Sequence, residues 1–222
     1  MAERSRSNPH AGQPVLMDGE PLERASAALI LLHGRGASAE SILTLAHDIG
    51  QPGFAYLAPQ AAGYTWYPQP FTAPLDANEP YLTSALALVD AVVEQVEGIG
   101  LGAERIVLAG FSQGACLALE YAARRARRYG GVLGFSGGLI GPDDAPRITI
   151  GSLDGTPVFL GSGDRDQHIP LARVEHSAEV FQRLGAAVTR RIYPNMGHAI
   201  NADEVAFASD LLSSLSTGTA AL

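Results

Sequence analysis

The stretch Gly110-Phe111-Ser112-Gln113-Gly114 decides the fold, because a strand pattern leads into it and a helix pattern follows it. Residues 105–109 are an apolar run of strand length, and residues 115–123 have the composition of a buried helix. G-x-S-x-G between a strand and a helix is typical of a nucleophile elbow, a tight turn that exposes a serine hydroxyl above a sheet. The alternative to a nucleophile elbow is an ordinary glycine-rich turn that holds a serine by chance. The flanking pattern favours Ser112 as a nucleophile.

Composition limits the classes of protein that this chain can represent. Its 222 residues are 46% hydrophobic and 17% charged, which fits one compact α/β domain. The net charge of -8 argues against nucleic acid or anionic membranes as main partners. All 15 cationic side chains are arginine, so a Schiff-base lysine and a serine-lysine dyad are excluded.

The N-terminal residues are polar and contain no apolar h-region, so we expect neither a signal peptide nor a membrane span. The single cysteine, Cys116, excludes an intrachain disulfide and is compatible with a cytoplasmic location. Because it follows Ser112 by four residues inside the expected helix, we interpret it as a packed thiol rather than a nucleophile.

Strand and helix patterns alternate along the chain, which predicts a mostly parallel sheet covered by helices on both faces. We expect a polar N-terminal segment at 1–20, a single domain at 21–216 and a frayed tail at 217–222. The expected strands are 27–32, 54–58, 105–109, 131–135, 157–160 and 187–193, and the expected helices are 38–49, 81–97, 115–123, 170–184 and 203–215.

Ligands of such sheets bind at the carboxyl ends of the strands, so the residues that follow each strand are the candidates for chemistry. The first strand is followed by His33-Gly34-Arg35-Gly36, and the last by a loop that contains His198. A base must take the proton of Ser112, and His198, in a glycine-containing loop, is the best candidate.

The other histidines fit this role less well. We expect His10, His47 and His176 to be solvated, His33 to brace the first loop, and His168 to lie near the acid loop without facing the serine. Histidine pairs with the spacing of a zinc helix are absent from the sequence, so we expect neither a metal nor a cofactor.

A third group must fix the tautomer of the base, and two aspartates compete for that role. Asp164 and Asp166 both lie in the loop after the strand at 157–160, and spacing alone does not separate them. The oxyanion that forms in acyl transfer needs fixed donors, for which we predict the backbone N–H groups of Gln113 and Arg35. The Arg35 side chain is a further candidate, for attracting an acidic substrate group.

Four motifs together resemble the phospholipase/carboxylesterase family of α/β-hydrolases, which includes acyl-protein thioesterases and small bacterial carboxylesterases. They are 32–36, 110–115, Gly163-Asp164-Arg165-Asp166 with Ile169-Pro170, and 196–198. The resemblance implies the α/β-hydrolase fold with a minimal lid, a Ser-His-Asp triad, Asp166 as its acid and Asp164 as a loop-bracing residue. Arg35-Gly36-Ala37 departs from the acyl-protein thioesterase pattern, and 63–68 resembles the bacterial esterase branch more.

We therefore predict a serine carboxylesterase that hydrolyses small to medium acyl esters through an acyl-enzyme. An acyl thioesterase, a lysophospholipase and a non-catalytic binder of the same fold remain as alternatives. The expected partner is a small-molecule ester, with no nucleic acid and no stable membrane association, and a homodimer is left open. Loop residues at the active edge should line the substrate site: Trp66, Tyr67, Phe71, Leu139 and Ile169.

Overall fold

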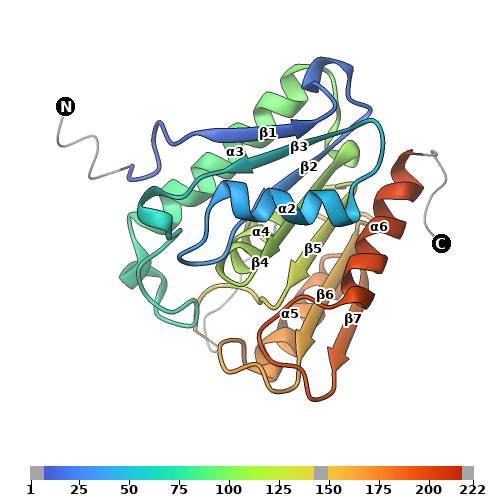
Figure 1. Cartoon of the computed structure of the whole chain (residues 1–222). Coiled ribbons are helices and arrows are strands. Elements are labelled where there is room, and N and C mark those ends of the chain that lie inside the picture. The colour runs from blue at the N-terminus through green and yellow to red at the C-terminus, as the bar shows by residue number, and fades with distance from the viewer. Residues whose placement is uncertain (1–7, 143–149, 217–222) are drawn as a thin grey trace.

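The structure, a computed structural model, describes residues 8–142 and 150–216 and contains one seven-stranded sheet (Figure 1). The strand order is β1-β3-β2-β4-β5-β6-β7. Only β1 is antiparallel to its neighbour, and every other pair is parallel. The strands are β1 (Val15–Gly19), β2 (Ala27–Leu32), β3 (Phe54–Pro59), β4 (Ile106–Phe111), β5 (Gly131–Phe135), β6 (Pro157–Gly163) and β7 (Ala187–Tyr193).

The long helices form two layers around this sheet (Figure 1). Residues of α2 (Ala39–Ile49) and α6 (Ala202–Ser216) share one apolar core with the sheet. The opposite face carries α3 (Tyr81–Gly98), α4 (Gln113–Arg124) and α5 (Leu171–Arg183) over a second core. Strands β2, β3 and β5 are buried along their whole length, as expected of parallel strands covered on both faces.

The expected alternation of strands and helices is confirmed, and most element ends differ from expectation by only one or two residues. The start of α2 follows its sequence signal closely: Ser38 is the N-cap, and its hydroxyl accepts the N–H of Ser41. The proline-rich stretch at 59–80 is ordered by two short 3-10 turns, 62–64 and 75–78. None of the helices in the part of the chain described here is long and apolar enough to cross a membrane.

The N-terminal region departs from expectation, because its residues from 8 onward pack into the domain. Strand β1 lies inside the segment 1–20 that we set apart as polar, and it pairs with β3 from Val15 opposite Pro59. His10, expected to be solvated, is buried. One of its ring nitrogens, Nδ1, accepts the N–H of Ala62 at 3.0 Å, so the other, Nε2, carries a proton and donates to the carbonyl of Trp66 at 2.9 Å. The predicted frayed tail, 217–222, lies outside the described residues.

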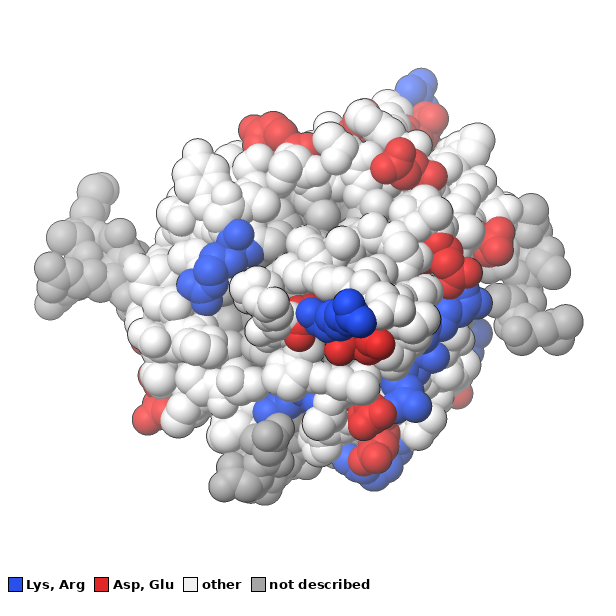
Figure 2. All heavy atoms as spheres, turned by 60° about the horizontal axis from the view of Figure 1, so that its bottom comes forward, with Lys and Arg blue, Asp and Glu red and all other residues white. Residues whose placement is uncertain are grey.

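The carboxyl ends of the parallel strands meet at one edge of the sheet, at the bottom of Figure 1. Figure 2 brings this edge forward: much of this face is uncharged, and basic and acidic groups gather near its middle and toward its lower right. The loops after β2, β4, β6 and β7 all start here, so this edge collects the candidate residues from four separate parts of the chain.

Candidate active site

Ser112 occupies a strained turn between β4 and α4. Its backbone lies at φ 56° and ψ -120°, a conformation that L-residues adopt only where the surroundings impose it. The turn is held on both sides, since the N–H of Ser112 donates to the carbonyl of Phe135 and its carbonyl accepts the N–H of Cys116, each at 3.0 Å. This is the geometry expected of a nucleophile elbow.

The two glycines of the pentapeptide are required by crowding. A Cβ at Gly110 would collide with the backbone of Gly114, and a Cβ at Gly114 would collide with the carbonyl of Leu32. Strand β2 and the first turn of α4 therefore approach each other closely beneath Ser112. Only glycine fits at these two positions, so the tight turn requires the small residues on both sides of the serine.

His198 and Asp166 lie together at the same edge. The Nδ1 of His198 is 2.7 Å from Oδ2 of Asp166, whose side chain is fully buried. The second carboxylate oxygen, Oδ1, accepts the backbone N–H groups of His168 at 2.8 Å and Ile169 at 3.0 Å. With Nδ1–H donating to Asp166, the imidazole keeps Nε2 free to accept a proton.

The environment of Asp166 keeps it ionised. Burial by itself would raise its pKa, but the hydrogen bond from His198 and the two backbone N–H donors outweigh this effect, so the pKa lies below its ordinary value. A carboxylate that remains charged holds the histidine in one orientation and stabilises the imidazolium that forms when it takes a proton.

A pocket of about 610 Å³ opens over these groups. Ser112 and His198 both line it, and the ring of His198 packs against Phe111 at 4.8 Å between centroids. Its walls are mainly apolar and come from the loop after β3, from the start of α4 and from the loop after β6: Tyr67, Pro68, Pro70, Phe71, Thr72, Cys116, Ile169 and Pro170.

The two residues predicted to donate to the oxyanion, Arg35 and Gln113, line the same pocket as Ser112, and a Cβ at Gly34, next to Arg35, would lie 3.5 Å from Ser112 Cβ. Within the described residues, neither of their backbone N–H groups has a hydrogen-bond acceptor. Two unpaired N–H groups beside a nucleophile are suited to bind a negatively charged oxygen.

The Arg35 side chain is engaged with protein groups. Its guanidinium donates to the carbonyls of Tyr67, Pro68 and Gln69 at 2.9, 2.9 and 3.0 Å. Most of the N–H donors that would attract an acidic substrate group are therefore already occupied by these carbonyls. Arg35 instead ties the loop after β2 to the aromatic loop at 64–71.

Two of the five residues predicted to bind substrate do not reach the pocket. Trp66 is fully buried, donates its indole N–H to the carbonyl of His33 at 2.8 Å and packs on the His33 ring. Leu139 is also fully buried, in the core beneath the pocket. Both are corrections: these apolar loop residues turn inward because the loops fold back onto the domain. Tyr67, Phe71 and Ile169 do line the pocket.

The remaining histidines of the edge have supporting positions. His33 accepts the N–H of Ala61 at its Nε2, so its Nδ1–H donates to the carbonyl of Gly34, and it braces the first loop as expected. Burial lowers the pKa of His33 and keeps the ring neutral. His168 lies near Asp166 as expected, but it also lines the pocket and packs edge-on against His198 at 4.8 Å.

The side chain of Asp164 does not brace the loop. It is exposed, and its carboxylate has no hydrogen-bond or ion-pair partner within residues 8–142 and 150–216. The bracing at this position comes from its backbone N–H, which donates to the carbonyl of Tyr193 at 3.0 Å. This corrects the role that the family resemblance implied for the side chain.

A buried carboxyl that sequence reasoning missed, Glu204, lies at the start of α6, just after the His198 loop. Asn201 caps this helix: its Oδ1 accepts the N–H groups of Asp203 and Glu204, and Glu204 Oε2 accepts the N–H of Asn201 at 2.9 Å. A Cβ at Gly161 would collide with the other oxygen, Oε1, so this carboxyl packs against β6. The capping pattern N-x-x-E was the available signal.

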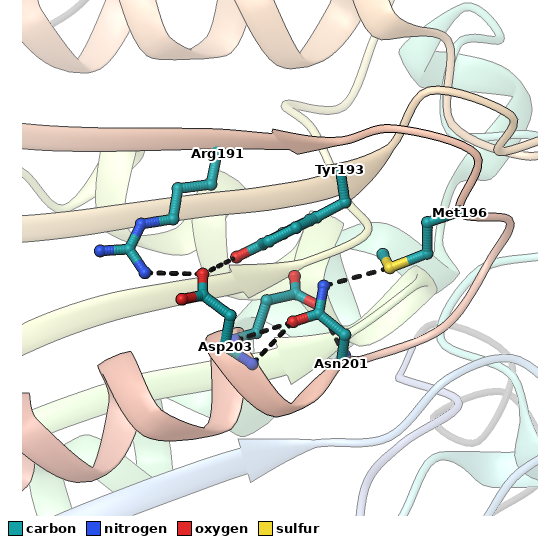
Figure 3. A network of polar contacts seen from close by, with 6 residues as sticks. Arg191, Tyr193, Met196, Asn201 and Asp203 are labelled. Carbon is teal, nitrogen blue, oxygen red and sulfur yellow. Dashed lines mark hydrogen bonds and ion pairs between the residues drawn. The ribbon is translucent and has the colours of Figure 1, made fainter.

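The same network secures the end of β7 (Figure 3). Asp203 Oδ2 accepts the Tyr193 hydroxyl and a guanidinium N–H of Arg191, each at 2.7 Å. Asn201 Nδ2 lies 3.1 Å from the sulfur of Met196, two residues before His198. Helix α6 and strand β7 are thereby joined on both sides of the loop that carries His198.

Among the described residues, no cluster of three potential metal ligands occurs.

A mostly parallel sheet with a serine elbow after one strand and a carboxylate-held histidine at the same edge defines the α/β-hydrolase fold. The chain belongs to the phospholipase/carboxylesterase family, whose model matches residues 19–216. The crystal structure of a phospholipase/carboxylesterase from Dyadobacter fermentans is similar, with 42% identity, a TM-score of 0.88, and coverage of 91% of this chain and 97% of that one.

Two further proteins are similar to this chain, one in sequence and one in fold. Acyl-protein thioesterase 1 of Gibberella zeae is 34% identical over 123 residues, 51% of this chain and 49% of that protein. The Bacillus cereus carboxylesterase has the same fold at 20% identity, with a TM-score of 0.71 over 96% of this chain and 98% of that one. The chain spans about half the length of the first curated relatives that it matches.

Proposed function

We propose that this protein is a serine carboxylesterase that hydrolyses small to medium acyl esters through an acyl-enzyme. The single observation that carries the proposal is the strained Ser112 in a pocket shared with His198, whose Nδ1 is held by Asp166 at 2.7 Å. A serine hydroxyl becomes nucleophilic only when a correctly oriented base takes its proton, and this arrangement supplies both.

In the proposed reaction, Nε2 of His198 takes the proton of Ser112 as Oγ attacks the ester carbonyl. The carbonyl oxygen becomes an anion that the N–H groups of Arg35 and Gln113 stabilise. The C–O bond to the alcohol breaks, and His198 gives its proton to the departing oxygen. A water molecule, deprotonated by His198, then attacks the acyl-enzyme and releases the acid and free Ser112.

The dimensions and chemistry of the pocket support the substrate class. At about 610 Å³ it can hold a small or medium acyl group. The side chains of Phe71, Ile169 and Phe111 offer apolar surface, and the lining that residues 8–142 and 150–216 provide contains no Asp or Glu. A neutral ester is therefore the simplest occupant.

Thioester hydrolysis is the second candidate, because the first curated relatives are named acyl-protein thioesterases. The same residues would serve, with sulfur replacing the alcohol oxygen as leaving atom. Lysophospholipid hydrolysis and a non-catalytic role are further alternatives. The cytoplasmic location and the homodimer stay predictions.

Rates on p-nitrophenyl esters of increasing chain length, on matched acyl thioesters and on lysophospholipids test the proposal, with Ser112→Ala as control. We expect the highest kcat/KM on esters of short to medium chains and no activity of Ser112→Ala. An optimum on long chains or on thioesters would move the assignment to the alternatives. Wild-type protein that a fluorophosphonate probe fails to label at Ser112 would contradict hydrolysis altogether.

A further inference from the structure

The two oxyanion donors lie on different parts of the chain. Arg35 is in the loop after β2, and Gln113 is the first residue of α4, after β4. These strands pair directly, with Leu32 opposite Gly110. An oxyanion hole stabilises the transition state only if its donors keep their positions while charge develops, because reorientation of a donor costs free energy.

The side chains of both donor residues bind the same short segment, 65–69. The Arg35 guanidinium donates to three of its carbonyls, those of residues 67, 68 and 69. The Gln113 carboxamide donates from Nε2 to the carbonyl of Tyr67 at 2.8 Å and accepts the N–H of Trp66 at 2.8 Å. The carbonyl of Tyr67 is thus a shared acceptor, 2.9 Å from Arg35 and 2.8 Å from Gln113.

The segment is itself anchored. Trp66 is fully buried and bound to the carbonyl of His33, and the N–H of Gly36 donates to the carbonyl of Tyr64 at 2.7 Å. The Thr65 hydroxyl donates to Gln113 Oε1 at 3.2 Å. Gln113 is only 6% exposed, so water cannot easily replace these bonds.

We propose that residues 65–69 form an oxyanion brace: through the Tyr67 carbonyl, the side chains of Arg35 and Gln113 fix the separation of their own backbone N–H donors. This inference rests on the proposed function. The side chains are positioning groups, since only the N–H groups would touch the substrate. The brace also couples the oxyanion hole to the pocket wall, because Tyr67 and Pro68 line the pocket.

The brace and a charge role for Arg35 predict different results for Arg35→Lys. Lysine keeps the positive charge, but a single ammonium cannot reproduce a planar fork that reaches three carbonyls. If Arg35 acts by charge, Arg35→Lys preserves activity, and the turnover of a neutral ester does not change. If Arg35 acts as a brace, Lys lowers turnover of a neutral ester.

The experiment measures kcat and KM on neutral p-nitrophenyl butyrate for wild type and five variants: Ser112→Ala, Arg35→Lys, Arg35→Ala, Gln113→Ala and Thr65→Val. It adds inhibition by an alkyl trifluoromethyl ketone, which forms an oxyanion on the serine. The control is Arg24→Lys, since Arg24 is an exposed arginine paired with Glu20. Thermal unfolding and circular dichroism establish that each variant is folded.

We expect Arg35→Lys and Gln113→Ala to lower kcat by about tenfold to a hundredfold, less than the loss of a whole donor, with KM within about threefold. The ketone should lose affinity by a similar factor. Millimolar guanidinium should restore part of the activity of Arg35→Ala. Thr65→Val should lower kcat about twofold to fivefold. This variant tests the brace if Arg35→Lys and Gln113→Ala do not fold.

Unchanged kcat in folded Arg35→Lys and Gln113→Ala, or in folded Thr65→Val if those two do not fold, would overturn the brace. A rise in KM alone would also overturn it. If wild type hydrolyses the ester and Ser112→Ala does not, these results refute the brace and leave the hydrolase assignment intact. If wild type and Ser112→Ala behave alike, the proposed function fails, and the brace fails with it.

Discussion

Replacing the buried carboxyl of Glu204 with an amide should make the protein less sensitive to pH. Burial is the main cause that raises the pKa of Glu204 to about 7 from its ordinary 4.5, with Asp203 adding to it and the N–H of Asn201 opposing it. Below pH 4.5 the carboxyl is protonated in both the native and the unfolded chain. Between pH 4.5 and 7 the native state keeps a proton that the unfolded chain has lost, so this group's contribution to stability falls as pH rises.

The size of this effect follows from linkage. Each pKa unit is worth about 1.4 kcal/mol, so the pKa change of Glu204 corresponds to about 3 kcal/mol of stability lost by pH 8. In Glu204→Gln the side chain stays uncharged at every pH. The free energy of unfolding of Glu204→Gln, relative to wild type, should therefore increase by about 3 kcal/mol between pH 4.5 and pH 8.

Urea unfolding at several pH values measures this difference, with the fluorescence of Trp66, the only tryptophan and a buried one, as the probe. Glu175→Gln is the matched control, because Glu175 is half-exposed on α5 and paired with Arg190. This control measures what the loss of an exposed carboxylate does by itself. Parallel stability curves for Glu204→Gln and wild type would refute the reasoning.

Three further predictions concern the reaction site. Ser112→Ala or His198→Ala should lower kcat on p-nitrophenyl butyrate by on the order of 10⁴ to 10⁶, and the double variant should lose no more, since the two groups act as a unit; additive losses would contradict a shared step. Asp166→Asn should severely reduce kcat while Asp164→Asn stays within about threefold of wild type, and the reverse order in the same assay would reassign the acid. Gly114→Ala should lower stability by about 3 kcal/mol or more, because its Cβ meets a β2 carbonyl, and an unchanged Tm would show that the turn can relax.

The sequence contained enough information for most of the fold, because β2 to β6 are mostly apolar runs of strand length that are separated by helix patterns or glycine-containing turns. Strand β1 was not predicted, because Val15–Gly19 is short, partly exposed and contains Asp18, so it lacks an apolar run. Its place in the sheet depends on pairing with β3, a contact distant in sequence. The burial of His10 was not predicted for the same reason, because its partners, the N–H of Ala62 and the carbonyl of Trp66, are also distant in sequence.

The site was predictable where a residue's position is set by the end of a strand. Ser112 and His198 reach one pocket for that reason. The direction of a loop side chain depends on what the loop packs against, and composition does not reveal it. Trp66 and Tyr67 are both buried, but only Tyr67 lines the pocket, although both looked equally suitable as walls.

The crowding beneath the serine affects how the sequences of relatives can diverge. Gly110 and Gly114 are held by contact with backbone atoms, so replacing either one disturbs the fold whether or not the protein is an enzyme. The hydroxyl of Ser112 is under no such steric constraint. A descendant that gave up hydrolysis could exchange the serine for alanine and keep both glycines. Among relatives, the glycine pair would therefore report common architecture, and the residue between them would report whether the chemistry survived.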